Sequence, residues 1–200
     1  MNQSAWQAQS LLLSYPDDEL LDRIPLLKEV AARLPDPVGS PLARFLTHAS
    51  STTLIRLATD YAATFDHHKK FSLYLTYFTH GDTRKRGLAL LRIKRAYRTA
   101  GLDLGAGELP DHLAVMLEFT ATVESDAGQR LLIEHRAGLE LLRLGLREAD
   151  SPWADVLDSV SATLPALAGR DEDVIARLAA AGPPDESVGL EPYSLTGDPR

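Results

Sequence analysis

Apolar residues recur at intervals of three and four along nearly the whole chain, and this spacing restricts the possible folds more than any other feature. An α-helix turns once in about 3.6 residues, so such spacing gathers the apolar side chains on one face. One clear case runs through Leu20, Ile24, Leu27 and Val30. No segment alternates apolar and polar residues over a useful length. The sequence therefore predicts an all-α fold, a single-domain bundle of roughly nine to ten helices.

Proline and glycine indicate where these helices begin and end. Pro16 closes the first helix, because the residue before a proline is biased toward extended backbone. The prolines and the glycine between residues 35 and 41 predict a loop. Pro110 is expected at the first position of a helix that reaches about Ser125, since its missing N–H costs nothing there. Residues 129–147 are leucine-rich and are expected to form one long helix.

Length and composition predict two parts of unequal size. At 200 residues, 44% of them hydrophobic, the chain is long enough for one well-filled core. We expect residues 1–181 to form a single all-helical domain. From Gly182 onward the composition turns to proline, glycine, serine and acidic residues, which predicts a flexible tail over residues 182–200.

Several classes of protein are disfavoured by what the sequence lacks. The chain has no cysteine, which excludes disulfides and thiolate metal sites. It has no HExxH motif, no phosphate-binding loop and no nucleophile elbow, so we expect no metal, no cofactor and no catalytic residue. A net charge of -7 argues against nucleic acid and anionic membrane as partners. With no signal peptide and no long apolar run to insert into a membrane, the protein is expected to be cytoplasmic.

The most distinctive local chemistry joins an apolar, aromatic segment, 71–79, to a strongly basic one, 84–98. Gly81 is expected to end the first helix and Gly101 the second. The side chain of Asp82 or Thr83 is expected to accept the free amide hydrogens that open the second helix. The basic segment holds seven cations and no acid, namely Arg84, Lys85, Arg86, Arg92, Lys94, Arg95 and Arg98. Placed at about 100° per residue, Leu88 and Leu91 fall inside the basic arc of this helix.

Two interpretations of the basic helix stay open. It is either the solvated face of an amphipathic helix or a binding surface. Clustered Lys and Arg are the footprint of nucleic-acid binding, so a helical nucleic-acid-binding regulator that uses residues 84–98 is the main alternative function. If the helix does bind a partner, the two leucines favour a protein segment over a duplex.

A second candidate site lies between Glu108 and Phe119. Asp111 is expected in the first turn of a helix, and Glu118, seven residues later, shares its side. Two carboxylates beside an apolar strip would suit a peptide that bears arginine. Three other roles are weighed: Asp111 complements the helix dipole, His112 is a partly buried packing residue, or the two form an acid–base pair of a helical enzyme.

Several runs of residues resemble the NarJ family, the assembly chaperones of respiratory nitrate reductase. The resemblance covers about residues 5–165 and rests on two separated groups of motifs in the same order as in the family. The first group comprises YAATFD at 61–66, SLYLTY at 72–77 and HGDTRKRG at 80–87, and the second is LPDHL…LEF at 109–119.

This resemblance implies a chaperone without catalytic activity and with the all-helical fold of the TorD/NarJ-like group. Its partner would be the catalytic (alpha) subunit of nitrate reductase, bound through its N-terminal segment and kept competent for insertion of the molybdenum cofactor before membrane docking. In the wider group the Asp-His pair is implicated in peptide binding, which carries over to Asp111 and His112.

The residues of the second candidate site fit that role. Asp111 and Glu118 would form the rim of a groove, and Leu113, Met116 and Phe119 part of its floor. Basic residues of 84–98 are a possible second contact with the client, with Arg84, Arg86, Arg92 and Arg95 as the candidates.

Overall fold

The computed structural model describes residues 2–105, 107–123, 125–167 and 169–181, and within these ranges every regular element is a helix. The all-α prediction is confirmed. There are eleven α-helices and one short 3-10 helix, η1, among the described residues. In chain order they are α1 (Asn2–Leu12), α2 (Asp18–Arg33), α3 (Gly39–Ser51), α4 (Leu54–Phe65), η1 (Lys69–Phe71), α5 (Leu75–His80), α6 (Arg84–Thr99), α7 (Leu113–Thr122), α8 (Ser125–Glu134), α9 (Arg136–Glu148), α10 (Trp153–Ala162) and α11 (Gly169–Ala181).

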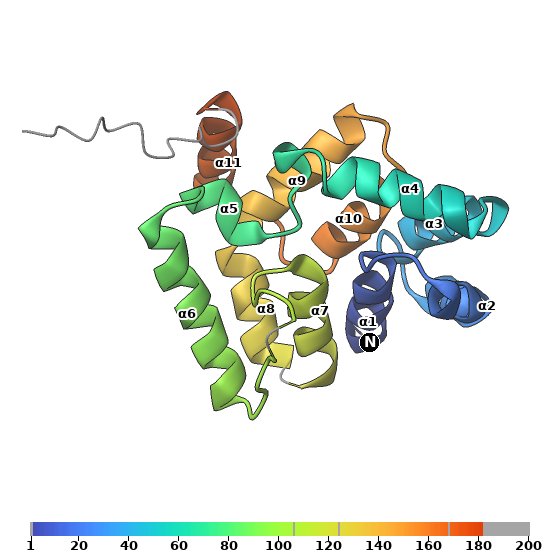
Figure 1. Cartoon of the computed structure of the whole chain (residues 1–200), viewed down its shortest axis with the longest axis horizontal. Coiled ribbons are helices and arrows are strands. Elements are labelled where there is room, and N and C mark those ends of the chain that lie inside the picture. The colour runs from blue at the N-terminus through green and yellow to red at the C-terminus, as the bar shows by residue number, and fades with distance from the viewer. Residues whose placement is uncertain (1, 106, 124, 168, 182–200) are drawn as a thin grey trace, which may run out of the picture.

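The helices pack around α1 and α10. Figure 1 shows α1–α4 on one side of the molecule and α5–α9 on the other, with α10 between them. Helix α1 packs on α7, α2 and α10, while α10 also contacts α3 and α9. The Trp153 side chain, 1% exposed, lies at the centre of an aromatic cluster. Its ring centroid is 5.6 Å from that of Phe45, 5.7 Å from that of Tyr61 and 5.5 Å from that of Phe65.

Two glycines end helices where the sequence predicts. Gly81 follows α5 with φ of 54°, and Gly101 follows α6 with φ of 84°. Both φ values lie in a region of backbone conformation that residues with a Cβ rarely adopt. After α6 the amide of Gly101 donates to the carbonyl of Arg98 (3.0 Å) and that of Leu102 to the carbonyl of Tyr97 (2.9 Å), a Schellman motif.

The predicted cap of the basic helix is wrong in its chemistry, although its position is right. Thr83 is the N-cap residue of α6 and makes no side-chain capping bond. Its hydroxyl instead donates to the carbonyl of His80 at 2.8 Å. The carboxylate of Asp82 accepts from the Arg86 guanidinium at 2.8 Å and not from a free amide of the helix.

Three predicted boundaries are also wrong. The 35–41 loop is shorter than expected, because α3 begins at Gly39 and accommodates Pro41 in its first turn, where no amide is needed. The expected helix 129–147 is broken at His135, so that α8 packs on α7 whereas α9 packs on α5 and α10. Helix α7 begins at Leu113 rather than at Pro110, and this third difference reshapes the candidate site.

Two further expectations concern the tail and the membrane. The predicted tail, 182–200, lies outside the described residues. Among the helices that are described, none is both long enough and apolar enough to cross a bilayer.

The close packing of α7 on α8 gives a prediction about Gly128. A Cβ at this position would lie 2.6 Å from the Cα of Thr120. Because that contact is with the backbone, the clash can be relieved only if α8 moves away from α7. Gly128→Ala should therefore lower the free energy of unfolding by about 1–3 kcal/mol. Gly87 is also the fourth residue of its helix, and a Cβ there would meet no atom of another described element within 4 Å, so it is the matched control. Gly87→Ala should raise stability by up to about 1 kcal/mol in the same urea titration; equal effects at both sites would contradict this packing argument.

Candidate functional site

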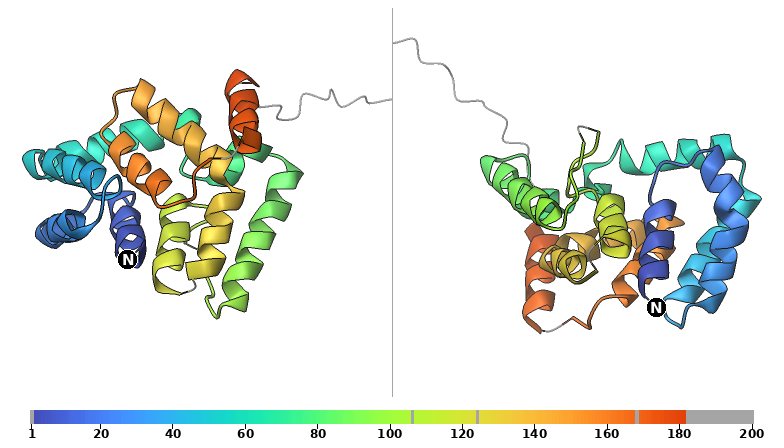
Figure 2. Two further views of the ribbon diagram at one scale, coloured as in Figure 1. Left: turned by 180° about the vertical axis from the view of Figure 1, so that it is seen from behind. Right: turned by 90° about the horizontal axis from the view of Figure 1, so that it is seen from below.

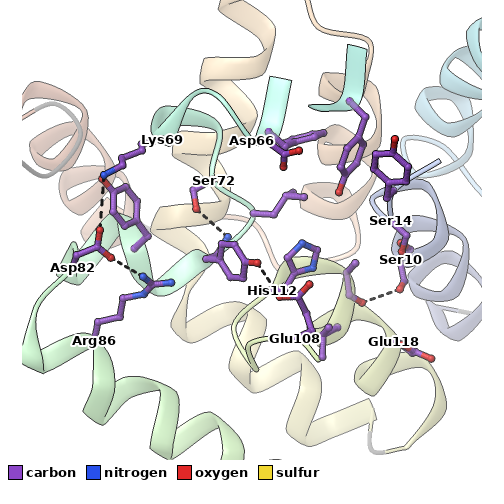
Figure 3. A pocket seen from close by; sticks show the side chains of 18 residues that line it. Ser10, Ser14, Asp66, Lys69, Ser72, Asp82, Arg86, Glu108, His112 and Glu118 are labelled. Carbon is purple, nitrogen blue, oxygen red and sulfur yellow. Dashed lines mark hydrogen bonds and ion pairs between the residues drawn. The ribbon is translucent and has the colours of Figure 1, made fainter. Parts of the chain in front are cut away.

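A groove of about 630 Å³ separates two walls of the molecule. One wall is formed by α1 and α4 together with the residues that follow each of them. The other wall is formed by the segment from η1 to the start of α6. Helix α7 and the residues just before it lie between the two walls. Figure 3 shows Arg86, Asp82 and Lys69 at one end, Ser10 and Ser14 at the other, and His112 and Glu108 in between. The lining residues are Ser10, Ser14, Tyr15, Tyr61, Phe65, Asp66, Lys69, Ser72, Leu73, Tyr74, Tyr77, Asp82, Arg86, Glu108, His112, Ala114, Val115 and Glu118.

The middle of the groove is built on a short antiparallel pairing of Tyr74 with His112. The amide of Leu113 donates to the carbonyl of Leu73 at 2.9 Å, and the amide of Leu75 donates to the carbonyl of Asp111 at 3.1 Å. Asp111 lies in a turn that the bond from the amide of His112 to the carbonyl of Leu109 (3.1 Å) closes, and His112 has extended backbone, so α7 starts only at Leu113. The pairing also brings the rings of Tyr74 and His112 edge to face, with centroids 5.2 Å apart.

Asp111 lies beneath the groove and not on its rim. Its side chain is fully buried, and its Oδ2 accepts from the amide of Thr76 at 3.2 Å and from the Thr76 hydroxyl. Because Thr76 is in the first turn of α5, the carboxylate caps that helix from a distant segment. Nη2 of Arg86 lies 3.8 Å from the same oxygen. Asp111 thus positions α5 and Arg86.

Arg86 is held over two tyrosines at one end of the groove. The carbon of its guanidinium lies 5.7 Å from the ring centroid of Tyr74 and 5.9 Å from that of Tyr77, within cation–π range. Nη1 donates to Asp82 at 2.8 Å, and Nε donates to the hydroxyl of Thr76 at 3.3 Å. A positive charge between aromatic rings and carboxylates is therefore already stable in this groove.

Tyr74 and His112 are both neutral near pH 7. Burial, together with the hydrogen bond from its hydroxyl to Glu108 (2.8 Å), raises the pKa of Tyr74 to about 12. Burial lowers the pKa of His112, and the negative charges of Glu108 and Asp111 offset only part of that effect. Nδ1 of His112 is buried with no hydrogen-bond partner among the described residues.

The remaining charges make the groove acidic. Asp66, Glu108 and Glu118 line it in addition to Asp82, which lies beside both Arg86 and Lys69, 4.0 Å from the latter. The aromatic wall supplies apolar surface, and Tyr15 within it is 57% exposed. An open groove with aromatic walls and surplus carboxylates suits a segment that carries apolar and basic side chains.

The structure separates the residues that the sequence analysis grouped as one site. His112 and Glu118 line the groove. The predicted floor is wrong, because Leu113, Met116 and Phe119 are 0%, 0% and 1% exposed and belong to the core. Asp111 and Glu118 do not share a helix face, since Asp111 precedes α7.

The aromatic lining was missed, although four of its five members lie in sequence runs already singled out and only Tyr15 lies outside them. Tyr61 and Phe65 come from the run 61–66, and Tyr74 and Tyr77 from the run 72–77. The dense aromatic content of both runs is a signal that they share a surface. Of the four arginines proposed as a second contact, only Arg86 lines the groove; Arg84, Arg92 and Arg95 are exposed elsewhere on α6.

The geometry gives no support to the acid–base alternative. The Asp111 carboxylate is bound to Thr76 and faces Arg86, and no hydrogen bond joins it to His112 in the described part of the chain. Nor do the described residues hold a group of three or more His, Asp or Glu side chains that could bind a metal. The fold and the groove together define a helical binding protein.

Comparison with known families agrees with that class. The family described as "Nitrate reductase delta subunit" matches residues 31–158. The chain belongs to this family.

Known relatives extend the match. The chain is 34% identical over 173 residues to the probable nitrate reductase molybdenum cofactor assembly chaperone NarJ of Bacillus subtilis, covering 84% of this chain and 92% of that one. It is 31% identical over 152 residues to the chaperone NarJ of Escherichia coli, covering 74% and 64%. It is 38% identical over 158 residues to the nitrate reductase-like protein NarX of Mycobacterium tuberculosis, covering 79% of this chain but only 24% of NarX.

A solved structure shares the fold. A putative redox enzyme maturation protein from Archaeoglobus fulgidus superposes with a TM-score of 0.59 at 21% identity, over 90% of this chain and 94% of that chain. This likeness confirms the helical architecture expected from the resemblance.

The buried position of Asp111 predicts a large effect on stability. Asp111→Ala leaves the Thr76 amide, the Thr76 hydroxyl and Arg86 without their shared partner, and should lower the free energy of unfolding by about 3–5 kcal/mol. Asp103 is the control, because it pairs with Arg98 at 3.6 Å while 79% exposed. Asp103→Ala should cost less than about 1 kcal/mol. Similar losses in urea unfolding would show that Asp111 does not support the fold.

The lowered pKa of His112 predicts a stability loss in mild acid. Its folded pKa lies below its unfolded value of about 6.5, so the unfolded chain binds the proton more readily. The contribution of His112 is present above pH 6.5 and is lost as the pH falls through the folded pKa. We expect His112→Gln to flatten the decline in unfolding free energy between about pH 7 and pH 5. His135, whose pKa burial also lowers, contributes in the same direction and remains in this variant. An unchanged slope would refute the assignment to His112.

Proposed function

We propose that this protein is an assembly chaperone that binds the N-terminal segment of the catalytic (alpha) subunit of nitrate reductase. In this role it keeps that subunit competent for insertion of the molybdenum cofactor, in the cytoplasm and before the subunit docks at the membrane. Membership of the family and the names of two relatives support the chaperone role. The observation that carries the proposal is the acidic, aromatic groove between α1, α4 and α5–α7.

The lining of the groove sets the kind of segment that it accepts. An amphipathic helix can bury its apolar face in such a groove and present basic residues to the rim. The apolar face would lie on Tyr15, Tyr61 and Phe65, and the basic residues would meet Glu108 and Glu118. Charge-assisted hydrogen bonds of this kind are about twice as strong as neutral ones.

The size of the groove limits what is bound. A volume of about 630 Å³ holds a few side chains of one segment rather than a folded domain. The chaperone would therefore hold its client by one short element and leave the rest of the subunit accessible for cofactor insertion. Binding and release, with no chemical turnover, are sufficient for this role.

The test is calorimetric titration of the full chain with a peptide of the first ~30 residues of the catalytic subunit, long enough for a helix that fills the groove. We expect saturable 1:1 binding. Glu118→Lys places a positive charge on the rim and should weaken binding at least about tenfold, which corresponds to about 1.4 kcal/mol. Glu148→Lys makes the same charge change on an exposed residue that does not line the groove, and should leave the affinity unchanged.

The Asp-His pair provides a second comparison in the same titration. His112→Ala should weaken binding directly, because His112 lines the groove, whereas Asp111→Ala should act through the position of α5 and Arg86. The folded fraction of each variant is checked by circular dichroism. Unchanged affinity in a well-folded Asp111→Ala, His112→Ala double variant, together with unchanged affinity in Glu118→Lys, would overturn the assignment of the groove.

A further inference from the structure

A second surface lies on the outer side of α6. We define the outer stripe as Arg84, Leu88, Leu91, Arg95 and Arg98, which recur at intervals of three and four and fall within an arc of about 80° at 100° per residue. The two leucines at its centre are among the most exposed large apolar residues of the protein, at 59% for Leu88 and 64% for Leu91. Arginines lie on the stripe at both ends of this apolar pair.

The outer stripe and the groove are on opposite sides of α6. The side that faces the protein buries Ile93 and Tyr97, which are 1% and 0% exposed, and directs Arg86 to the groove. Figures 1 and 2 show α6 at the edge of the molecule, so its outer side is not covered by another described element. A ligand on the stripe would therefore not compete directly with a segment in the groove.

Most of the charge on the outer side of α6 has no ion-pair partner among the described residues. Arg86 pairs with Asp82, and Arg98 lies 3.6 Å from Asp103. Within the described part of the chain, no ion pair involves Arg84, Arg92 or Arg95. Residues 84–98 contribute +7 to a chain whose net charge is -7, so the rest of the chain carries -14. The stripe is thus a cationic surface on an acidic protein, and Arg98 is its one member with an ion-pair partner in the described part of the chain.

We propose that the outer stripe docks an acidic amphipathic helix of a partner protein. The partner helix would place an apolar pair against Leu88 and Leu91, and Asp or Glu residues on either side of that pair opposite Arg84 and Arg95. Buried apolar contact would supply the binding free energy, while the charges would set orientation and speed association. This surface is additional to the client groove and does not depend on the function proposed for it.

The same observations disfavour other occupants. A nucleic acid would meet the charge of -14 on the remainder of the protein, and its phosphates would gain nothing from the two leucines. Two leucines are too narrow an apolar face for a helix that lies in a membrane interface. In a symmetric dimer through this stripe, arginines would face arginines.

The experiment measures binding of the full chain to a fluorescein-labelled acidic peptide by anisotropy. The probe is a helix of ~20 residues, with Leu at i, i+3 and i+7 flanked by Glu. We expect saturable binding. The Leu88→Ser, Leu91→Ser double variant should weaken it at least about tenfold, and Arg95→Glu should weaken it as well. Leu144→Ser is the matched control, since Leu144 is 46% exposed on α9 and should not affect the affinity. Unfolding curves verify that each variant is folded.

Independence from the groove is tested with the same proteins. Glu118→Lys should bind the acidic probe as the unaltered chain does, and the Leu88→Ser, Leu91→Ser variant should bind the basic client peptide normally. If the client peptide fails to bind any protein while the acidic probe behaves as expected, the groove proposal falls and the stripe proposal stands.

Four results would overturn the stripe proposal. The first is no binding of the acidic probe, and the second is equal binding of a peptide of the same composition with its leucines scattered. The third is that a 20-bp duplex, or vesicles with about 30% phosphatidylserine, bind more tightly than the acidic probe and lose affinity in the Leu88→Ser, Leu91→Ser variant. The fourth is that the probe binds only after Asp185→Asn, Glu186→Gln, Glu191→Gln, because the chain's own C-terminal segment would then be the occupant.

Discussion

The backbone pairing between residues 73–75 and 111–113 is the contact on which the site depends. Two amide hydrogen bonds, of 2.9 and 3.1 Å, join segments that lie more than thirty residues apart in the chain. The pairing stops α7 from starting earlier and places the Asp111 carboxylate under the first turn of α5. Tyr74, His112 and Arg86 acquire their positions from it. A buried carboxylate with these partners stabilises the arrangement only while all of them remain, which makes the site sensitive to the loss of any one.

This dependence separates the residues that support the groove from those that a ligand can touch. Asp111 is adjacent in sequence to His112, yet it is fully buried, whereas His112 and Glu118 line the groove. The same separation applies to charge. The Arg86 guanidinium is neutralised by Asp82 and Asp111, so the surplus acidity of the groove remains for a cationic ligand.

Local features could be predicted from the sequence, and features set by distant contacts could not. The ends of α5 and α6 depend on the backbone of Gly81 and Gly101, and both were predicted. Leu88 and Leu91 were placed on the basic arc by periodicity alone, and both are exposed. The start of α7 was mispredicted, because a proline at 110 favours a helix locally while the pairing with 73–75 is invisible to local rules. The floor was mispredicted for another reason, because Leu113, Met116 and Phe119 belong to the core and the sequence does not show which apolar side chains line a groove.

The distribution of the charges around α6 therefore says more about its partners than their number does. Seven cations in one segment suggest nucleic acid if they are only counted. On the inner side of α6, Arg86 lines the groove, where Asp82 and Asp111 neutralise its charge and hold it against two tyrosines. Outward, the arginines of the stripe surround an exposed apolar pair that a phosphate backbone cannot use. In the two proposals, α6 contributes Arg86 to the client groove and its outer stripe to a second protein partner, and the acidic remainder of the chain disfavours polyanions on either side.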